Sequence, residues 1–128
     1  MDSMIDFFAT LPSWQRGVLI ALIADVAQSY FILRQLDLEL EISRRTLKIN
    51  DETVEFYNRR LFGGVSNQLE VDQATANRSR TAATIPELER QIVTQENLVN
   101  FLVGRNPGPI PRGTALTDQY YPPSVPAG

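Results

Sequence analysis

The chain has 128 residues, no cysteine, no histidine and a formal net charge of −3. This length predicts one ordinary domain, and the two missing residue types exclude disulfides, thiolate zinc sites and catalysis by cysteine or histidine. The acidic pI of about 4.9 argues against a nucleic-acid partner, because a basic face supplies most of that affinity. We predict no nucleic-acid partner, no cofactor, no metal site and no enzymatic activity.

Residues 1–12 are predicted to form a short N-terminal segment with one turn of helix. Ser3 and Asp6 have the spacing of a capping box, and Pro12 ends the turn. Ser13 then stands where the N-cap of the next helix would lie.

Targeting signals are not visible in this sequence. The first 15 residues carry two acids and no base, unlike the basic start of a secretory signal peptide. The wholly apolar run at residues 18–24 is far shorter than the roughly 20 residues that span a bilayer. We therefore read this run as a buried helix face and predict no transmembrane helix.

Residues 13–61 are predicted to form one long helix with a coiled-coil seam. Spacings of three and four residues alternate through six heptads, and no proline interrupts them. The seam positions are Leu19, Leu22, Val26, Ser29, Leu33, Leu36, Leu40, Ser43, Leu47, Asn50, Val54, Tyr57 and Leu61. Such a helix would be about 73 Å long at about 1.5 Å per residue, so we expect a rod.

Two groups of residues in this helix do not fit a simple seam, namely polar residues on the seam and apolar residues off it. Ser29, Ser43 and Asn50 could set the register, line a wet lumen, or simply be tolerated on the seam. Asp25 falls off the seam and is predicted to be solvated or to lie at the edge of an interface. A stripe off the seam, here called the apolar flank, would stay exposed in a lone hairpin and predicts oligomers. The residues of the apolar flank are Val18, Ile20, Ile23 and Ile42.

A second, weaker seam predicts a helix over residues 67–103. Its positions are Val71, Ala74, Arg78, Thr81, Ile85, Leu88, Ile92, Gln95, Val99 and Leu102. Pro86 inside this pattern predicts a kink or a restart of the helix, with Thr84 as a new cap. Gly104 stands in the C′ position that ends a helix.

The segment between the two seams predicts a tight turn. Gly63 and Gly64 allow positive φ, and Ser66 is positioned to cap the next helix. Gly63-Gly64 is either an ordinary turn or a docking tip, since Phe62 and Val65 would give the rod an apolar end.

The fold class is therefore predicted as all-α, a long antiparallel two-helix coiled-coil hairpin with an extended C-terminal tail. We place the hairpin at residues 13–103, with helices at about 13–61 and 67–103 and the tip at 62–66. The Pro/Gly-rich linker at 104–128 holds six of the eight prolines.

Four blocks of sequence resemble one family. Residues 60–74 resemble the periplasmic hairpin tip of TolC-like outer-membrane efflux factors, which have an Arg, a Gly-containing turn, a Ser or Thr, then Leu-Asp/Glu-Val. Residues 24–34 are similar to the start of the family's long periplasmic helix. Residues 84–92 and 102–113 are similar to the NodT-type branch, the partners of tripartite RND pumps. Residues 122–128 also resemble the linker before that branch's second repeat.

The resemblance implies a transport role. Family members are trimers whose helical hairpins close into a periplasmic tunnel for drugs, metals or other solutes, and whose tips meet an adaptor coupled to an inner-membrane pump. It places this chain at the outer membrane and periplasm. The residues implied to face the adaptor are Arg60, Gly63, Gly64, Val65, Ser66, Leu69 and Asp72.

The departures from the family are also clear. Residues 1–15 do not resemble it, and we see no signal peptide, lipid-anchoring cysteine, membrane strands or second repeat in this sequence. We therefore expect about one quarter of an efflux factor, with membrane contact only through the missing parts. The alternative is a stand-alone coiled-coil interaction protein that binds itself or a periplasmic adaptor.

Overall fold

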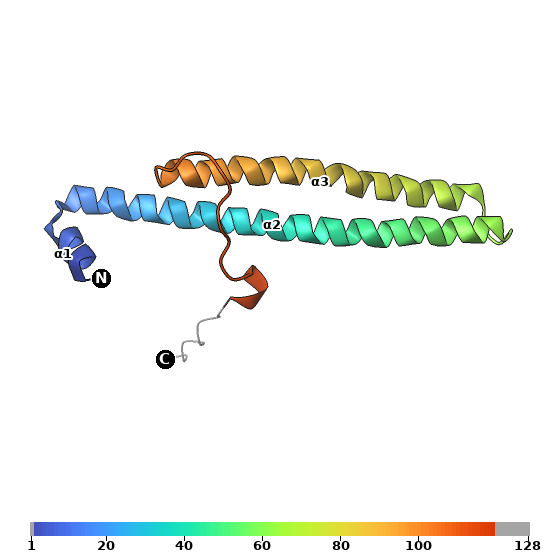
Figure 1. Ribbon diagram of the computed structural model, residues 1–128, viewed down its shortest axis with the longest axis horizontal. Coiled ribbons are helices and arrows are strands. Elements are labelled where there is room, and N and C mark those ends of the chain that lie inside the picture. The colour runs from blue at the N-terminus through green and yellow to red at the C-terminus, as the bar shows by residue number, and fades with distance from the viewer. Residues whose placement is uncertain (1, 120–128) are drawn as a thin grey trace.

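The computed structural model describes residues 2–119 and contains four helical elements within them. They are α1 (Asp2–Thr10), α2 (Ser13–Phe62), α3 (Gln68–Leu102) and the short 3-10 helix η1 (Leu116–Asp118). No strand occurs in this part of the chain. The helices α2 and α3 lie antiparallel and side by side (Figure 1), which confirms the predicted all-α hairpin. The predicted linker residues 120–128 lie outside the described residues.

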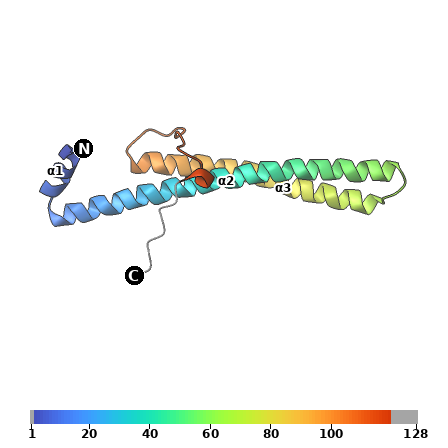
Figure 2. The ribbon, with the colours of Figure 1, turned by 90° about the horizontal axis from the view of Figure 1, so that it is seen from below.

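The molecule is a rod with one helix longer than the other. The 50 residues of α2 make a helix of about 75 Å, and the 35 residues of α3 make one of about 52 Å. The beginning of α2 therefore extends past the end of α3, and α1 folds back beside this overhang (Figure 2). We call this the open end of the hairpin and the opposite end the tip.

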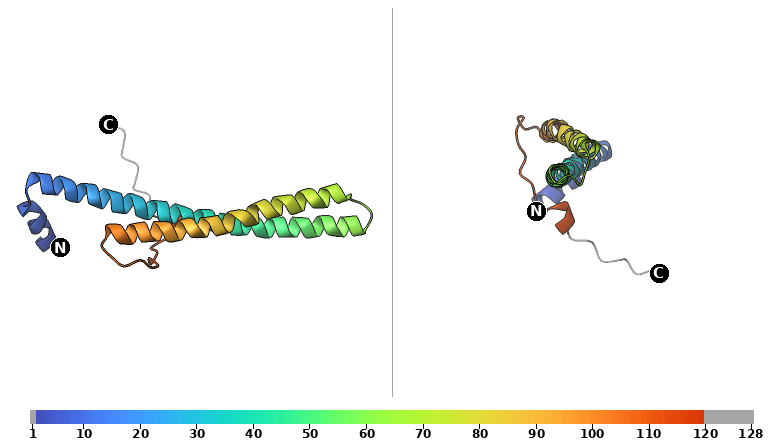
Figure 3. Two further views of the ribbon diagram at one scale, coloured as in Figure 1. Left: turned by 90° about the horizontal axis from the view of Figure 1, so that it is seen from above. Right: turned by 90° about the vertical axis from the view of Figure 1, so that its right-hand side faces the viewer.

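Both predicted seams form the interface between α2 and α3. Of the thirteen α2 seam positions only Leu22 is exposed, and of the ten α3 positions only Arg78 is exposed. The buried apolar residues all belong to the seams, namely Leu33, Val71, Ala74, Ile92 and Val99. The helices α2 and α3 lie against each other along one side only (Figure 3). Because two helices cannot enclose each other, the core is a single line of seam residues, and most other residues are exposed.

Two polar seam residues, Asn50 and Gln95, form hydrogen bonds across the interface. The Asn50 amide donates to the Thr81 hydroxyl at 2.9 Å, and the Gln95 amide donates to the Ser29 carbonyl oxygen at 2.9 Å. The exposed Arg78 instead reaches Asp51 of α2 in an ion pair. The structure therefore favours the register-setting interpretation for Asn50. Asp25 is exposed, as predicted.

Pro86 does not restart α3, so the predicted restart was wrong. The helix runs without interruption from Gln68 to Leu102 with Pro86 exposed inside it. Proline removes one backbone hydrogen bond, but the seam residues Ile85 and Leu88 hold the adjoining turns against α2. The Thr84 hydroxyl donates to the Thr81 carbonyl at 2.7 Å and caps nothing.

Two predicted N-caps were also wrong. Ser13 is the first residue of α2, its N-cap is Pro12, and no side chain caps this end. Asn67, and not Ser66, caps α3, with its side-chain oxygen accepting from the Glu70 N–H at 3.1 Å. Asparagine is among the best N-cap residues, and Asn67 stands directly before the first helical turn, so it caps α3 in place of Ser66.

The first half of α2 also meets a simple membrane criterion. By length and composition α2 contains an 18-residue stretch, with a mean hydropathy of 1.5, that could cross a membrane. The sequence analysis counted only the uninterrupted run at residues 18–24, whereas Asp25 is the single charge between Arg16 and Arg34. Core helices and signal sequences meet the same criterion, so it assigns no membrane position by itself.

Candidate functional site

The tip is a turn closed by backbone hydrogen bonds. The Val65 N–H donates to the Arg60 carbonyl at 2.9 Å, and the Gly64 N–H donates to the Leu61 carbonyl at 3.0 Å. This pair of bonds is the Schellman motif, which needs a left-handed residue at C′. Gly64 supplies it with φ +73°, whereas Gly63 has φ −78°. Only one of the two glycines therefore uses the positive φ that the sequence suggested for both.

Apolar side chains cover the end of the rod. Phe62 is 99% exposed, and Val65 and Leu69 are also exposed. Exposing three large apolar side chains beside one turn does not stabilise this chain by itself. Phe62 ends α2, Val65 lies in the turn and Leu69 lies in the first turn of α3, so all three residues are at the tip.

A hydrogen-bonded group fixes the start of α3. The half-buried Ser66 hydroxyl donates to the Glu70 carboxylate, and the Glu70 N–H in turn binds the Asn67 side chain. The Ser66 hydrogen bond lowers the pKa of Glu70 below its ordinary 4.5; the Asn67 N–H and the Arg60 charge act in the same direction and partial burial acts against them. The tip loop is thereby tied to the first turn of α3.

The two charged residues that were predicted to flank the tip are each engaged within their own helix. The Arg60 guanidinium lies over the Phe56 ring, 5.5 Å from its centroid. The Asp72 carboxylate accepts from the Gln68 amide at 2.9 Å. The seven predicted tip residues therefore lie together at one end of the rod. Phe56, Asn67 and Glu70 join them, and their spacing (i, i+4 for Phe56 with Arg60, i, i+3 for Asn67 with Glu70) is a signal that the sequence analysis missed.

A second polar site lies near the open end, where the chain after α3 turns back. Gly104, with φ +73°, ends α3 in the predicted C′ position. Residues 105–114, here called the strap, then cross from α3 to α2 in an irregular conformation (Figure 1). The buried Asn100 amide donates to the Gly108 carbonyl at 2.7 Å, and the Gly113 N–H donates to the Tyr30 hydroxyl at 3.0 Å. The strap is thus bound along both helices.

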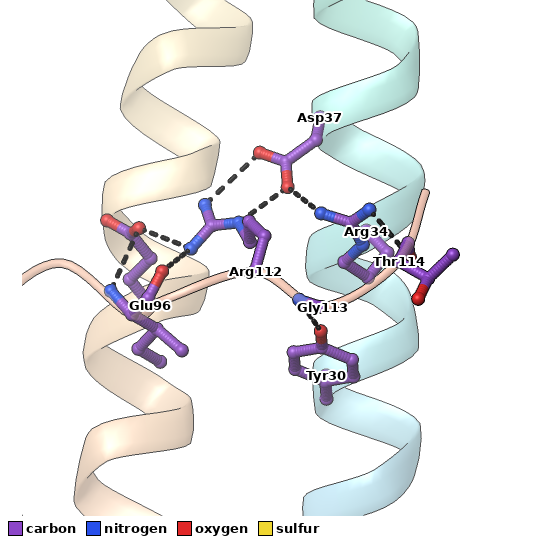
Figure 4. Close-up of polar contacts among 8 residues, drawn as sticks. Tyr30, Arg34, Asp37, Glu96, Arg112, Gly113 and Thr114 are labelled. Carbon is purple, nitrogen blue, oxygen red and sulfur yellow. Dashed lines mark hydrogen bonds and ion pairs between the residues drawn. The ribbon is translucent and has the colours of Figure 1, made fainter. Parts of the chain in front are cut away.

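Arg112 lies at the centre of this site (Figure 4). Its Nε and Nη2 donate to the two Asp37 oxygens at 2.6 and 3.1 Å, and its Nη1 donates to Glu96 Oε1 at 2.8 Å. These bonds, led by those to Asp37, raise the pKa of the Arg112 guanidinium, and partial burial acts against them. Arg34 completes the cluster, with Nη1 3.5 Å from Asp37 and Nη2 donating to the Thr114 carbonyl at 3.1 Å. Two arginines therefore balance two carboxylates.

Comparison of this sequence with known proteins identifies its family. A family model described as "Outer membrane efflux protein" matches residues 13–105, which contain all of α2 and α3. The chain belongs to the outer membrane efflux protein family. This confirms the resemblance to TolC-like efflux factors. Comparison with solved structures finds no match.

Curated family members give the same result. The cation efflux system protein CusC of Escherichia coli (strain K12) is 30% identical over 115 residues, which cover 89% of this chain and 25% of CusC. The solvent efflux pump outer membrane protein SrpC of Pseudomonas putida is 32% identical over 103 residues, 80% of this chain and 22% of SrpC. The probable outer membrane lipoprotein SilC of Salmonella typhimurium is 31% identical over 90 residues, 70% of this chain and 20% of SilC. The chain spans about a quarter or less of the length of these relatives. The names of CusC and SrpC describe efflux proteins, and the name of SilC describes an outer membrane lipoprotein.

Proposed function

We propose that this chain acts as a periplasmic helical hairpin of an outer-membrane efflux channel. The observation that carries the proposal is the family match across the whole of both long helices. The rod shape supports it, because a hairpin with a single line of core contacts buries most of its apolar surface only when other helices pack beside it. In this function the chain is structural and non-catalytic, and its partners are other hairpins and an adaptor protein.

The apolar flank supports a role in assembly. Val18, Ile20, Ile23 and Ile42 are all more than half exposed on α2, as predicted for the apolar flank. The prediction that residues 18–24 form a buried helix face was wrong for this chain, because α3 ends before it reaches them. Ile23 also lines an apolar groove at the open end, between α2 and the last turn of α3. Exposed apolar stripes of this length are typical of helices that pack against further helices. We propose that neighbouring hairpins cover this flank, in a trimer of the full-length family type.

We further propose that the tip is the surface that docks on a periplasmic adaptor of a tripartite pump. The residues proposed for this contact are Arg60, Gly63, Gly64, Val65, Ser66, Leu69 and Asp72, with Phe62 as the most exposed apolar anchor. Aromatic and aliphatic anchors at the centre of a small patch supply most of the affinity in protein interfaces. The bonds at Ser66, Asn67 and Glu70 hold the loop rigid and so reduce the entropy that docking would cost.

A capture experiment with a matched control tests the docking surface. Phe62 and Phe101 are both phenylalanines with exposed side chains, the first at the tip and the second at the open end. We expect Phe62→Asp to weaken capture by an immobilised adaptor of an RND-type pump by about tenfold or more, while Phe101→Asp is captured like the parent chain. Equal capture of both variants, or no capture of the parent chain, would contradict the proposed tip assignment.

A further inference from the structure

The strap changes helices at Arg112. Before Arg112, its contacts are with α3, where Asn100 binds Gly108 and Glu96 accepts from the Ile110 N–H at 3.4 Å. After Arg112, its contacts are with α2, where Tyr30 binds Gly113 and Arg34 binds Thr114. Arg112 itself binds both helices, through Asp37 of α2 and Glu96 of α3. Among the strap side chains, it is therefore the one whose bonds join α2 to α3 directly.

The chemistry of this contact is specific to arginine. The guanidinium binds Asp37 through two nitrogens and still has a third nitrogen for Glu96 (Figure 4). Lysine has a single nitrogen, so it cannot form the two-pronged contact and reach the second carboxylate with the same geometry. The side chain of Glu96 is only 13% exposed, so loss of Arg112 would leave a poorly solvated carboxylate without its counter-ion.

The position of the contact gives it a consequence for the whole hairpin. At the tip, the turn around Gly64 joins α2 to α3 covalently. At the open end nothing covalent holds the two helices together, and helix ends fray unless they are tied down. We propose that Arg112 is a positioning residue that closes the open end, by fixing the strap as a bridge between α2 and α3 and so setting where the chain leaves the hairpin. This role is independent of adaptor docking and of tunnel assembly.

Amide hydrogen exchange on the full chain tests this role. The N–H groups of Ile110 and Gly113 report strap docking, because their acceptors are Glu96 and Tyr30 on the helices. We expect Arg112→Gln to speed their exchange by about tenfold or more, as for the loss of charge-assisted hydrogen bonds. Exchange should also quicken at Val99 near the open end, and stay unchanged at Val71 near the tip.

Two further variants make the result decisive. Arg105→Gln removes the same charge from an exposed strap arginine and should exchange like the parent chain. Arg112→Lys should give intermediate protection. The proposal is overturned if Arg112→Gln leaves the strap amides protected, if Arg105→Gln has the same effect, or if Arg112→Lys restores full protection. Loss of protection along the entire hairpin, including Val71, would overturn it too, because Arg112 would then support the fold as a whole.

Discussion

The side-chain amide of Asn50 in α2 donates a 2.9 Å hydrogen bond to the hydroxyl of Thr81 in α3, within the apolar seam. The Thr81 hydroxyl has a second partner, because it also donates to the Asn77 carbonyl of its own helix at 3.2 Å. The Asn50 amide donates across the interface to Thr81. The two partners are therefore unequal. A slip of one helix along the other would separate them, so the pair fixes the register.

Because Thr81 has a second hydrogen-bond partner, we expect substitutions of Thr81 and of Asn50 to lower the free energy of unfolding by different amounts. Thr81→Val should lower the free energy of unfolding by about 1–3 kcal/mol, because it leaves the half-buried Asn50 amide unpaired. Asn50→Leu should cost less, since Thr81 keeps its bond to Asn77. The double variant should be close to the parent chain. Urea unfolding of the four proteins measures this, and strictly additive effects would show that the pair contributes no coupling.

The core prediction concerns Leu33, which is fully buried on the α2 seam. Leu33→Ala should destabilise the hairpin by about 2–5 kcal/mol through lost burial and a cavity. Leu69→Ala is the matched control, because this leucine is exposed and should change stability by less than about 0.5 kcal/mol. Thermal or urea unfolding followed by circular dichroism compares the two, and similar losses would contradict the assignment of the core.

The two tip glycines provide a second matched pair. Gly64→Ala forces a Cβ into the left-handed region and should cost about 1–2 kcal/mol. Gly63→Ala should be neutral or slightly stabilising, because its φ of −78° suits any residue and the added Cβ would lie 3.5 Å from the nearest atom. Urea unfolding distinguishes them. Equal stability of the two variants would show that Gly64 is not held at positive φ.

The start of α3 should respond to acid through Glu70. The folded pKa of Glu70 lies below its ordinary 4.5, so ionised Glu70 stabilises the fold above pH 4.5, and this contribution is lost as the pH falls through the lowered value. Ser66→Ala should move the pKa back up toward 4.5, measured by NMR titration of the carboxyl carbon. Ser79→Ala, at an exposed serine of α3, should leave it unchanged. If the pKa of Glu70 in Ser66→Ala were the same as in the parent chain, the assigned hydrogen bond would be contradicted.

Local patterns in the sequence were sufficient to predict the hairpin. The alternation of three and four residues placed Leu33, Val71 and Val99 in the core, and Gly104 marked the end of α3. The restart predicted at Pro86 was wrong, because the packing of α3 against α2 on both sides of Pro86 outweighs the local effect of one proline. The prediction of Ser66 as the cap of α3 was also wrong, because the neighbouring Asn67 is an equally good capping residue and was not considered.

The strap could not be predicted in this way. Arg112 and Asp37 are 75 residues apart, and the local pair that Asp37 forms with Arg34 gives no sign of a bond to Arg112. Contacts of this kind depend on the path that the chain takes after Gly104, which the composition of a Pro/Gly-rich segment does not specify. Composition indicated an extended tail, whereas its first ten residues are bound to both helices.

We propose that this hairpin folds by itself and assembles with other hairpins through the apolar flank. Light scattering for solution mass, with circular dichroism on the same sample, tests it most directly. We predict a strongly helical chain that forms a discrete oligomer, and a lower mass with unchanged helix content when Ile23 and Ile42 are both replaced by Glu. A helical monomer at every concentration, or a polydisperse and largely unfolded chain, would contradict the claim.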